Sequence, residues 1–319
     1  MIAALMRVIL HYTAGPMLVN RLFSLNQHGL SVTVCPGGDQ AGLHGLLAET
    51  EVIWHVLEPV TEDVIAAAPH LRLIQKIGVG VNAIDLDAAA RRKIAVCNMP
   101  GTNTQAVAEM TLLLMLSCLR RVSRLDTATR DGRGWSLPAA EQDAYGEIAG
   151  RTVGLIGFGA VPRRLAPVLQ ALGARVLYWS RSAPSTAVGE PRSFSNLLTE
   201  SDIVSLHVPL TDETTRLIDS VALDQMKPGA LLVNTARGPL VDEGAMVEAL
   251  RSGHLRAAGL DVFEQEPTPA DNPVLRLPNV VVSPHVAWLT EETMERSLAV
   301  AVENCRRLGA GEELLHQVV

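Results

Sequence analysis

Short β-rich runs alternate with helical patterns along most of this 319-residue chain, and this alternation constrains the fold more than any other feature. In the first hundred residues the predicted strands are 6–12, 30–35, 51–56, 71–78 and 94–98. Consecutive parallel strands need a long crossover connection, which is usually a helix. The alternation therefore predicts a parallel α/β sheet, and this first unit ends near residue 99.

A second α/β unit is predicted from Arg151 onward. A long apolar helix from about Asn103 to Arg121 precedes it, and the polar segment 126–150 is expected to form an irregular surface loop or arm. A final amphipathic helix is predicted over residues 291–308. The second unit has six predicted strands, a number and spacing typical of a dinucleotide-binding sheet. They are 152–157, 175–180, 203–208, 230–236, 257–262 and 279–283.

Composition excludes several classes of protein. The chain is 48% hydrophobic and 19% charged, which excludes a disordered chain. Its formal net charge of −7 disfavours a nucleic-acid partner, because phosphate binding needs a basic face. Four widely spaced cysteines without a CxxC pair disfavour disulfides and zinc, so no metal site is expected. The longest apolar stretch, 110–119, is about half of the ~20 residues that cross a bilayer, so we expect a cytoplasmic protein without membrane contact.

A glycine-rich turn follows the first strand of the second unit. Gly157 permits the tight turn, and Gly159 lets the backbone approach a pyrophosphate at the start of the next helix. Pro162 occupies the place of the third glycine of the dinucleotide-binding fingerprint. Proline is tolerated in the first turn of a helix, but close packing of the helix on the strand is lost. A glycine pair alone is equally explained as a plain turn, and its strand–turn–helix context favours a nucleotide site.

The end of the next strand bears on the choice of cofactor. NAD enzymes place an acidic residue there to bind the ribose 2′-hydroxyl, whereas this chain has Ser180 followed by Arg181. A serine and a guanidinium suit a 2′-phosphate, so we predict NADP(H), with NAD(H) as the other possibility. The alternative is that Arg181 covers the adenine ring or is solvated.

Seven stretches from Glu51 onward together resemble the D-2-hydroxyacid dehydrogenase family (D-isomer specific), with a pattern similar to glyoxylate/hydroxypyruvate reductases. The resemblance implies two Rossmann-like parallel-sheet domains, with a dinucleotide-binding domain (100–288) inserted into a split, flavodoxin-like substrate domain (1–99 and 289–319). It also implies a homodimer. The stretches are LRLIQKIGVGVNAIDL (71–86), NMPGTNTQAVAEMTLLLML (98–116), GLIGFGAV (154–161), HVPLTDETTRLID (207–219), MKPGALLVNTARGPLVDE (226–243), AGLDVFEQEP (258–267) and SPHVAW (283–288).

The resemblance implies a catalytic set of Arg237, Glu266 and His285. Each lies just after a predicted strand, and the carboxyl ends of parallel strands are where such sheets bind ligands. His285 is the proposed acid/base, since histidine exchanges protons near neutral pH. Glu266 would orient its ring and favour the protonated form, and Arg237 would bind the substrate carboxylate. Each residue alone is equally explained as a turn residue, but three together after a dinucleotide motif favour catalysis.

The resemblance also implies substrate and cofactor contacts. Val79 and Gly80 would bind the substrate carboxylate through their backbone N–H groups, and Trp288 would narrow the pocket for short acids. Thr235 and Ala236 lie in the cofactor groove, His207-Val208-Pro209 lines the adenosine, and Asp261 binds the carboxamide. The full predicted cofactor set is Thr104, Gly157, Phe158, Gly159, Ala160, Val161, Ser180, Arg181, His207, Val208, Pro209, Thr235, Ala236 and Asp261.

The leading hypothesis is therefore an NADP(H)-dependent oxidoreductase that reduces glyoxylate or hydroxypyruvate. The alternatives are an NAD(P)-sensing regulator of the same fold and a dehydrogenase for a longer sugar or aromatic 2-hydroxy acid. The sequence does not assign a role to Trp54, His55 or Glu58, which follow a strand of the substrate domain. A carboxylate repels an acidic substrate, so Glu58 either points away or binds a hydroxyl or an amine of the substrate.

Overall fold

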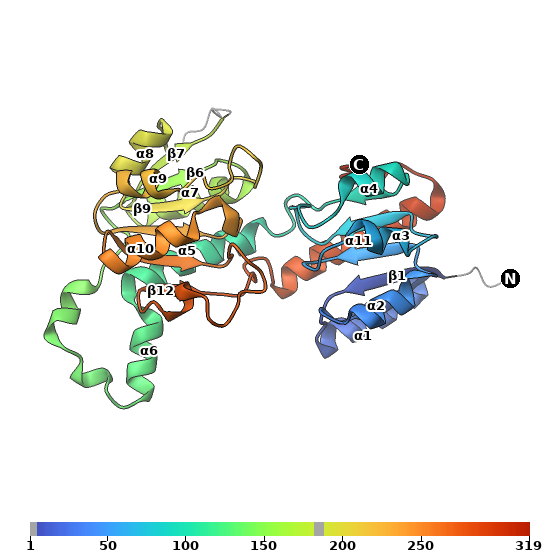
Figure 1. Cartoon of the computed structure of the whole chain (residues 1–319), viewed down its shortest axis with the longest axis horizontal. Helices are drawn as coiled ribbons and strands as arrows, with labels where there is room; N and C mark the ends of the chain where they lie inside the picture. The colour runs from blue at the N-terminus through green and yellow to red at the C-terminus, as the bar shows by residue number, and fades with distance from the viewer. Residues whose placement is uncertain (1–4, 182–187) are drawn as a thin grey trace. The chain divides into compact units, whose positions relative to one another are not determined.

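The computed structural model describes residues 5–181 and 188–319. The chain divides into two compact units (Figure 1). Unit 1 comprises Met1–Asn103 and Thr290–Val319, and unit 2 comprises Thr104–Leu289. The sequence places these divisions at 99/100 and 288/289, whereas the compact units divide at 103/104 and 289/290.

Unit 1 is built on a five-stranded parallel sheet with the order β2-β1-β3-β4-β5. All five of these strands were expected, because each is a short hydrophobic run bounded by polar residues. The strands are β1 (Met6–His11), β2 (Leu30–Cys35), β3 (Val52–His55), β4 (Leu73–Lys76) and β5 (Ala95–Cys97).

One hydrophobic core of unit 1 lies between the sheet and three short helices. The helices α2 (Gln40–Leu47), α3 (Glu62–Ala66) and α4 (Leu86–Arg91) each begin after a residue whose side chain accepts a backbone N–H of the first turn. Such a cap stabilises a helix by about 1 kcal/mol. Unit 1 also contains α1 (Pro16–Ser24), a 3-10 turn (Leu25–His28) and α11 (Glu291–Ala310).

The helix α11 joins unit 1 although about 190 residues separate it from β5. Its Asn304 is fully buried, and the side-chain amide donates to Gln75 Oε1 on β4 at 2.6 Å. Asn304 Oδ1 also accepts the backbone N–H of Leu315 at 2.8 Å. Unit 1 is therefore assembled from both ends of the chain, as expected for a split domain.

Unit 2 contains a seven-stranded parallel sheet with the order β12-β11-β10-β9-β6-β7-β8. Six of the strands lie at the predicted places. The seventh, β8, is a two-residue edge strand that the sequence did not indicate, because a Glu-Pro pair carries no strand pattern. The strands are β6 (Thr152–Ile156), β7 (Arg175–Trp179), β8 (Glu190–Pro191), β9 (Ile203–Leu206), β10 (Ala230–Asn234), β11 (Leu255–Leu260) and β12 (Val280–Val282).

Helices cover both faces of this sheet, and the strands are accordingly hydrophobic on both sides. Leu155 packs in one core with α5 and α7, whereas its neighbour Ile156 packs in the other core with α8, α9 and α10. Successive side chains of a strand point to opposite faces, so the two cores are the two faces of one sheet. The helices are α5 (Thr104–Arg120), α7 (Ala160–Ala171), α8 (Phe194–Glu200), α9 (Ser220–Gln225) and α10 (Glu243–Ser252).

One expectation about local structure was wrong, and one helix was not predicted. The segment 126–150 was expected to be irregular, but its first residues belong to α6 (Val122–Arg130), and 3-10 turns follow. An ion pair between Asp126 and Arg130, one helical turn apart, supports the end of α6. The helix α2 was not predicted, because Gly42 and Gly45 lower the helix propensity of this segment. It forms nevertheless, and Leu43 and Leu47 of the helix are buried in the core.

Within residues 5–181 and 188–319, no helix is both long enough and apolar enough to cross a membrane.

Candidate active site

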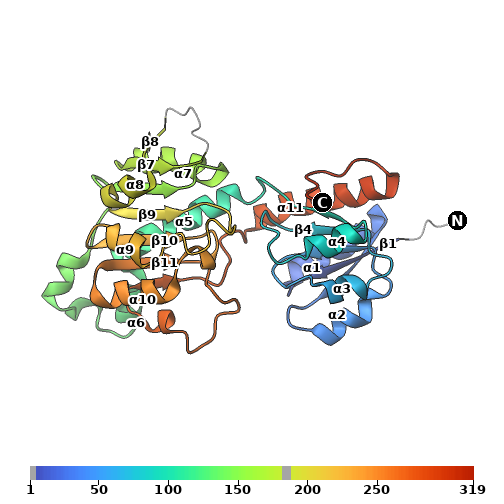
Figure 2. The ribbon, with the colours of Figure 1, turned by 45° about the horizontal axis from the view of Figure 1, so that its top comes forward.

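The three predicted catalytic residues follow three neighbouring strands of unit 2. Arg237 lies after β10, Glu266 after β11 and His285 after β12, and these strands are paired side by side at one edge of the sheet. Figure 2 shows β9, β10 and β11 as adjacent strands of this sheet. Because all the strands are parallel, the structure brings the three loops to the same end of the sheet.

His285 and Glu266 are in direct contact. The Nδ1 atom of His285 lies 2.6 Å from Glu266 Oε2, and the other carboxylate oxygen accepts the backbone N–H of Phe263 at 2.9 Å. Burial opposes ionisation of Glu266. The hydrogen bonds from His285 and from the Phe263 N–H, together with the charges of His285 and Arg237, outweigh burial and lower the pKa of Glu266 below its usual value. Glu266 therefore accepts a hydrogen bond from Nδ1–H, which leaves Nε2 of the imidazole as the atom that can exchange a proton.

Asp261 holds the loop that carries His285. His285 has a φ of 54°, which non-glycine residues adopt only when the surrounding structure requires it. The fully buried carboxylate of Asp261 accepts Ser283 Oγ at 2.6 Å and the backbone N–H groups of Val286 and Ala287 at 2.9 Å. Burial raises the pKa of Asp261, and these hydrogen bonds oppose the shift. The contacts assign Asp261 a positioning role, and its predicted contact with a carboxamide stays a prediction.

Arg237 is positioned by Asn234 and Gly238. The buried Asn234 donates from Nδ2 to the Arg237 carbonyl at 2.8 Å and accepts the Ala236 N–H at 3.0 Å. A Cβ at Gly238 would overlap the Phe263 carbonyl, so only glycine lets this loop pack against the loop that carries Glu266. Burial lowers the pKa of Arg237, and the charge of Glu266 opposes that shift. Asn234 was missed from the sequence, although a polar residue at the end of a buried strand was a usable signal.

The glycine-rich turn has the geometry that a dinucleotide needs. Gly157 has a φ of 94°, and an added Cβ would lie 2.5 Å from the His207 carbonyl oxygen. Its backbone N–H donates to Trp179 at the end of β7, so the turn sits between β7 and β9. Two independent constraints therefore require glycine at this position.

The start of α7 offers backbone donors to a ligand. Gly159 caps the helix without a side-chain hydrogen bond, and a Cβ built there meets no atom within 4 Å. Ala160 and Val161 form the first helical positions, where N–H groups have no partner within the helix. Pro162, which has no N–H, is buried at the third position. These residues fit a pyrophosphate, because the open backbone at Gly159 lies beside two amides at the positive end of the helix.

Ser180 and Arg181 lie directly after β7, beside the glycine-rich turn. Ser180 is partly exposed and Arg181 is exposed. In the described part of the chain no hydrogen bond or ion pair occupies the guanidinium. It does lie near Glu213, whose pKa is lowered mainly by hydrogen bonds from Thr211 and its own backbone and further by the Arg181 charge.

The remaining predicted cofactor residues are divided among several elements. His207 follows β9, its Nε2 lies 3.0 Å from Ser205 Oγ, and burial lowers its pKa to about 3. The Thr235 hydroxyl lies 2.9 Å from that of Thr111 on α5. Phe158 is buried against Tyr178, with ring centroids 4.2 Å apart. Of the other residues of this set, Thr104 is the first residue of α5, Val208 and Pro209 follow His207, and Ala236 precedes Arg237.

The predicted substrate residues belong to both units. Val79 and Gly80 follow β4 of unit 1 and are exposed and partly exposed. Trp288 belongs to unit 2 and is buried, and its indole N–H donates to the His285 carbonyl at 3.1 Å. This bond helps to hold the catalytic loop, while a contact between Trp288 and substrate stays a prediction.

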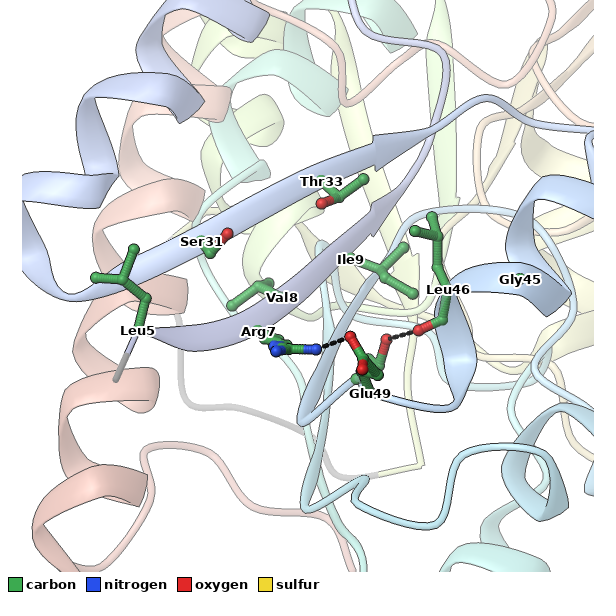
Figure 3. A pocket seen from close by; sticks show the side chains of 10 residues that line it. Leu5, Arg7, Val8, Ile9, Ser31, Thr33, Gly45, Leu46 and Glu49 are labelled. Atoms are coloured by element: carbon green, nitrogen blue, oxygen red, sulfur yellow. Dashed lines mark hydrogen bonds and ion pairs between the residues drawn. The ribbon is translucent and has the colours of Figure 1, made fainter. Parts of the chain in front are cut away.

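Unit 1 also contains a hollow of about 490 Å³ beside β1, β2 and α2 (Figure 3). It contains none of the predicted site residues, and its Arg7 is already paired with Glu49. Arg7 lies near the amino end of β1, whereas parallel sheets bind ligands at their carboxyl ends. We therefore do not assign the active site to this hollow. Among the described residues no group of three His, Cys, Asp or Glu side chains is arranged to hold a metal ion.

Comparisons with known proteins show the family of the chain. Residues 112–287 match the family "D-isomer specific 2-hydroxyacid dehydrogenase, NAD binding domain". A glyoxylate reductase of Aeropyrum pernix is 42% identical over 257 residues, which are 78% of this chain and 77% of that protein.

Two solved structures are similar over nearly the whole chain. An NAD-dependent formate dehydrogenase of Staphylococcus aureus in complex with NAD has a TM-score of 0.89 and 26% identity, and the match covers 98% of this chain and 99% of that one. An NADPH-dependent glyoxylate/hydroxypyruvate reductase of Sinorhizobium meliloti in complex with NADP and malonate has a TM-score of 0.83 and 28% identity, with 98% and 97% covered. The matched segment and the dinucleotide turn lead to one conclusion: the chain belongs to the D-isomer specific 2-hydroxyacid dehydrogenases, NAD(P)-dependent oxidoreductases that act on CH–OH groups.

Proposed function

We propose that this enzyme reduces short 2-oxo acids, glyoxylate or hydroxypyruvate, with NADPH as the electron donor. The observation that carries the proposal is the 2.6 Å contact between His285 Nδ1 and Glu266, on loops that follow two neighbouring strands beside Arg237. Reduction of a 2-oxo acid needs a hydride, a proton and a group that binds the carboxylate. These loops supply the last two.

The nicotinamide supplies the hydride when the cofactor is bound. His285 then donates the proton from Nε2 to the carbonyl oxygen, because Glu266 occupies Nδ1 and fixes the ring. Arg237 binds the substrate carboxylate through its planar guanidinium and polarises the carbonyl. Asn234 holds the Arg237 backbone carbonyl, and one guanidinium nitrogen of Arg237, Nη1, donates to the Ala236 carbonyl at 2.6 Å. Val79 and Gly80 of unit 1 would donate backbone N–H groups to a substrate carboxylate.

The preference for NADPH follows from the end of β7. An exposed arginine next to a serine offers donors to a 2′-phosphate, and no carboxylate stands at these two positions to repel it. Glu213 lies within electrostatic range of Arg181. The named reductase from Sinorhizobium meliloti, bound to NADP, supports the same choice.

We also propose that the enzyme is a homodimer. Unit 2 exposes apolar side chains along α5 and the following segment, including Leu113, Val122 and Trp135, which is 98% exposed. Exposed apolar side chains, aromatic ones above all, are enriched at interfaces between subunits. Sedimentation at micromolar concentration should give twice the mass of one chain.

The test of the reaction is oxidation of NADPH and of NADH, followed by absorbance, with glyoxylate, hydroxypyruvate, pyruvate and phenylpyruvate. We expect turnover of the short acids with a higher kcat/KM for NADPH than for NADH. The His285→Asn variant should bind the cofactor but lose turnover. Tight cofactor binding without reduction of any of these acids would contradict the proposal.

A further inference from the structure

The first turn of α7 offers few backbone donors to a ligand. Ala160 and Val161 are the first two helical residues, and Pro162, the third, has no N–H. The next N–H, that of Arg163, already donates to the Gly159 carbonyl at 3.2 Å. Within the helix, a pyrophosphate can therefore be bound by the N–H groups of Ala160 and Val161 alone.

The positive charge of the helix end is also small compared with that of the ligand. Each phosphate of a pyrophosphate carries a negative charge, whereas the N-terminus of a helix is equivalent to roughly half of one positive charge. The residues of the turn, 157–161, are all uncharged. A cationic side chain beside the turn would therefore strengthen the binding of a dinucleotide.

Arg163 brings a guanidinium to this turn. Its Nε donates at 3.0 Å to the carbonyl of Phe158, which lies between Gly157 and Gly159. The side chain thus runs back past the first residue of the helix, in the direction that long helical side chains prefer. Because Arg163 is three residues after Ala160 and four after Gly159, these residues share one face of α7.

This face of α7 is open to a ligand. Gly159, Ala160 and Arg163 are exposed, and a Cβ built at Gly159 meets no atom within 4 Å. Among residues 5–181 and 188–319, no hydrogen bond or ion pair engages Nη1 or Nη2 of Arg163. The contact of Nε with Phe158 therefore orients the guanidinium and leaves its two terminal nitrogens as donors.

The neighbouring arginine is engaged elsewhere. Arg164 donates from Nε to Gln105 Oε1 on α5 at 2.5 Å. Successive residues of a helix are rotated by about 100°, so Arg164 faces α5 while Arg163 faces the turn. Of these two arginines, the contacts place Arg163 beside the dinucleotide turn.

We propose that Arg163 is a further cofactor-binding residue, whose guanidinium binds the pyrophosphate of NAD(P)H at the start of α7. The inference rests on the proposed function only in requiring a nicotinamide dinucleotide, whichever acid is reduced. A guanidinium binds phosphate oxygens through paired, charge-assisted hydrogen bonds. Arg163 thus supplies donors where Pro162 has none. Its ligand is common to NADPH and NADH, unlike the 2′-phosphate proposed to bind Arg181.

Fluorescence titration of the whole protein with NADPH and with NADH tests this inference. Arg163→Gln should raise both Kd values by the same factor, about 10-fold or more, because a charged donor is lost. Arg163→Lys keeps the charge and should recover part of the affinity. The matched control is Arg251→Gln, in the last turn of α10, where the exposed Arg251 pairs with Glu248. It should leave both Kd values unchanged.

Adenosine distinguishes binding of the pyrophosphate from mere support of the turn. It lacks both phosphates, so its Kd, measured by competition, should be the same in the parent and in Arg163→Gln. These titrations need no turnover, so absence of glyoxylate reduction would refute the proposed function and leave this test intact. Unchanged Kd values for both dinucleotides, a loss for NADPH alone, or an equal loss for adenosine would each overturn the inference.

Discussion

Replacing His55 with glutamine should flatten the pH dependence of stability between pH 6.5 and about 3. His55 is fully buried, and burial followed by the charge of Lys76 lowers its pKa from 6.5 to about 3. In this window the unfolded chain binds a proton at His55 that the folded chain does not bind. The free energy of unfolding therefore rises with pH up to about 6.5 and then levels off.

The size of the effect follows from the width of the window. At pH 5.0, which is 1.5 units below 6.5, the loss is about 1.5 × 1.36, or about 2 kcal/mol. Glutamine places an amide nitrogen where His55 Nε2 donates to the Glu58 carbonyl, so it keeps that bond but does not titrate. The pKa values of His11 and His207 are also lowered by burial, but both residues are present in the two proteins, so their contributions cancel in the difference.

Urea denaturation followed by circular dichroism at pH 7.5 and pH 5.0 measures this difference. The stability of the parent should fall between the two pH values by about 2 kcal/mol more than that of His55→Gln. His70→Gln, at an exposed position of unit 1, controls for the exchange of a histidine for a glutamine. Parallel pH dependences in the parent and in His55→Gln would show that the buried imidazole does not resist protonation as argued.

Three further predictions concern unit 2. Glu266→Gln should lower kcat/KM about 10- to 100-fold without changing cofactor affinity, because the acceptor of the 2.6 Å hydrogen bond from His285 loses its negative charge. An unchanged rate would remove Glu266 from the catalytic set. Gly157→Ala should weaken cofactor binding in fluorescence titrations at least about 10-fold, since its φ is 94° and its Cβ would meet the His207 carbonyl; native affinity would contradict the role of the turn. Arg181→Ala should raise the KM for NADPH about 10-fold and leave that for NADH nearly unchanged, and equal effects on both cofactors would place Arg181 outside the 2′-phosphate site.

Much of the fold and of the candidate site was predictable because it depends on local signals. Hydrophobic runs marked the strands, and residues such as Arg237 and His285 stood directly after them. The contact of His285 with Glu266 required only that β11 and β12 be neighbours, as their order in the chain suggested.

What the sequence did not disclose depends on register and close packing. The row of His11, His55 and Lys76 exists only because three strands pair in one particular register. The need for glycine at position 238 arises from a carbonyl group 25 residues later in the chain, at Phe263. Asp261 was assigned to the cofactor, yet its described hydrogen bonds hold the loop of His285, since a carboxylate after a strand looks the same in sequence for either role.

The strand order of unit 2 separates the recognition of the electron donor from the chemistry. Ser180 and Arg181 follow β7, whereas the catalytic loops follow β10, β11 and β12, and β9 and β6 lie between the two groups. Substitutions at distant positions without shared partners usually act additively. Exchange of one dinucleotide for the other at the end of β7 should therefore combine freely with altered catalytic loops. A sheet arranged in this way lets an enzyme change its redox pool and its reaction in separate evolutionary steps.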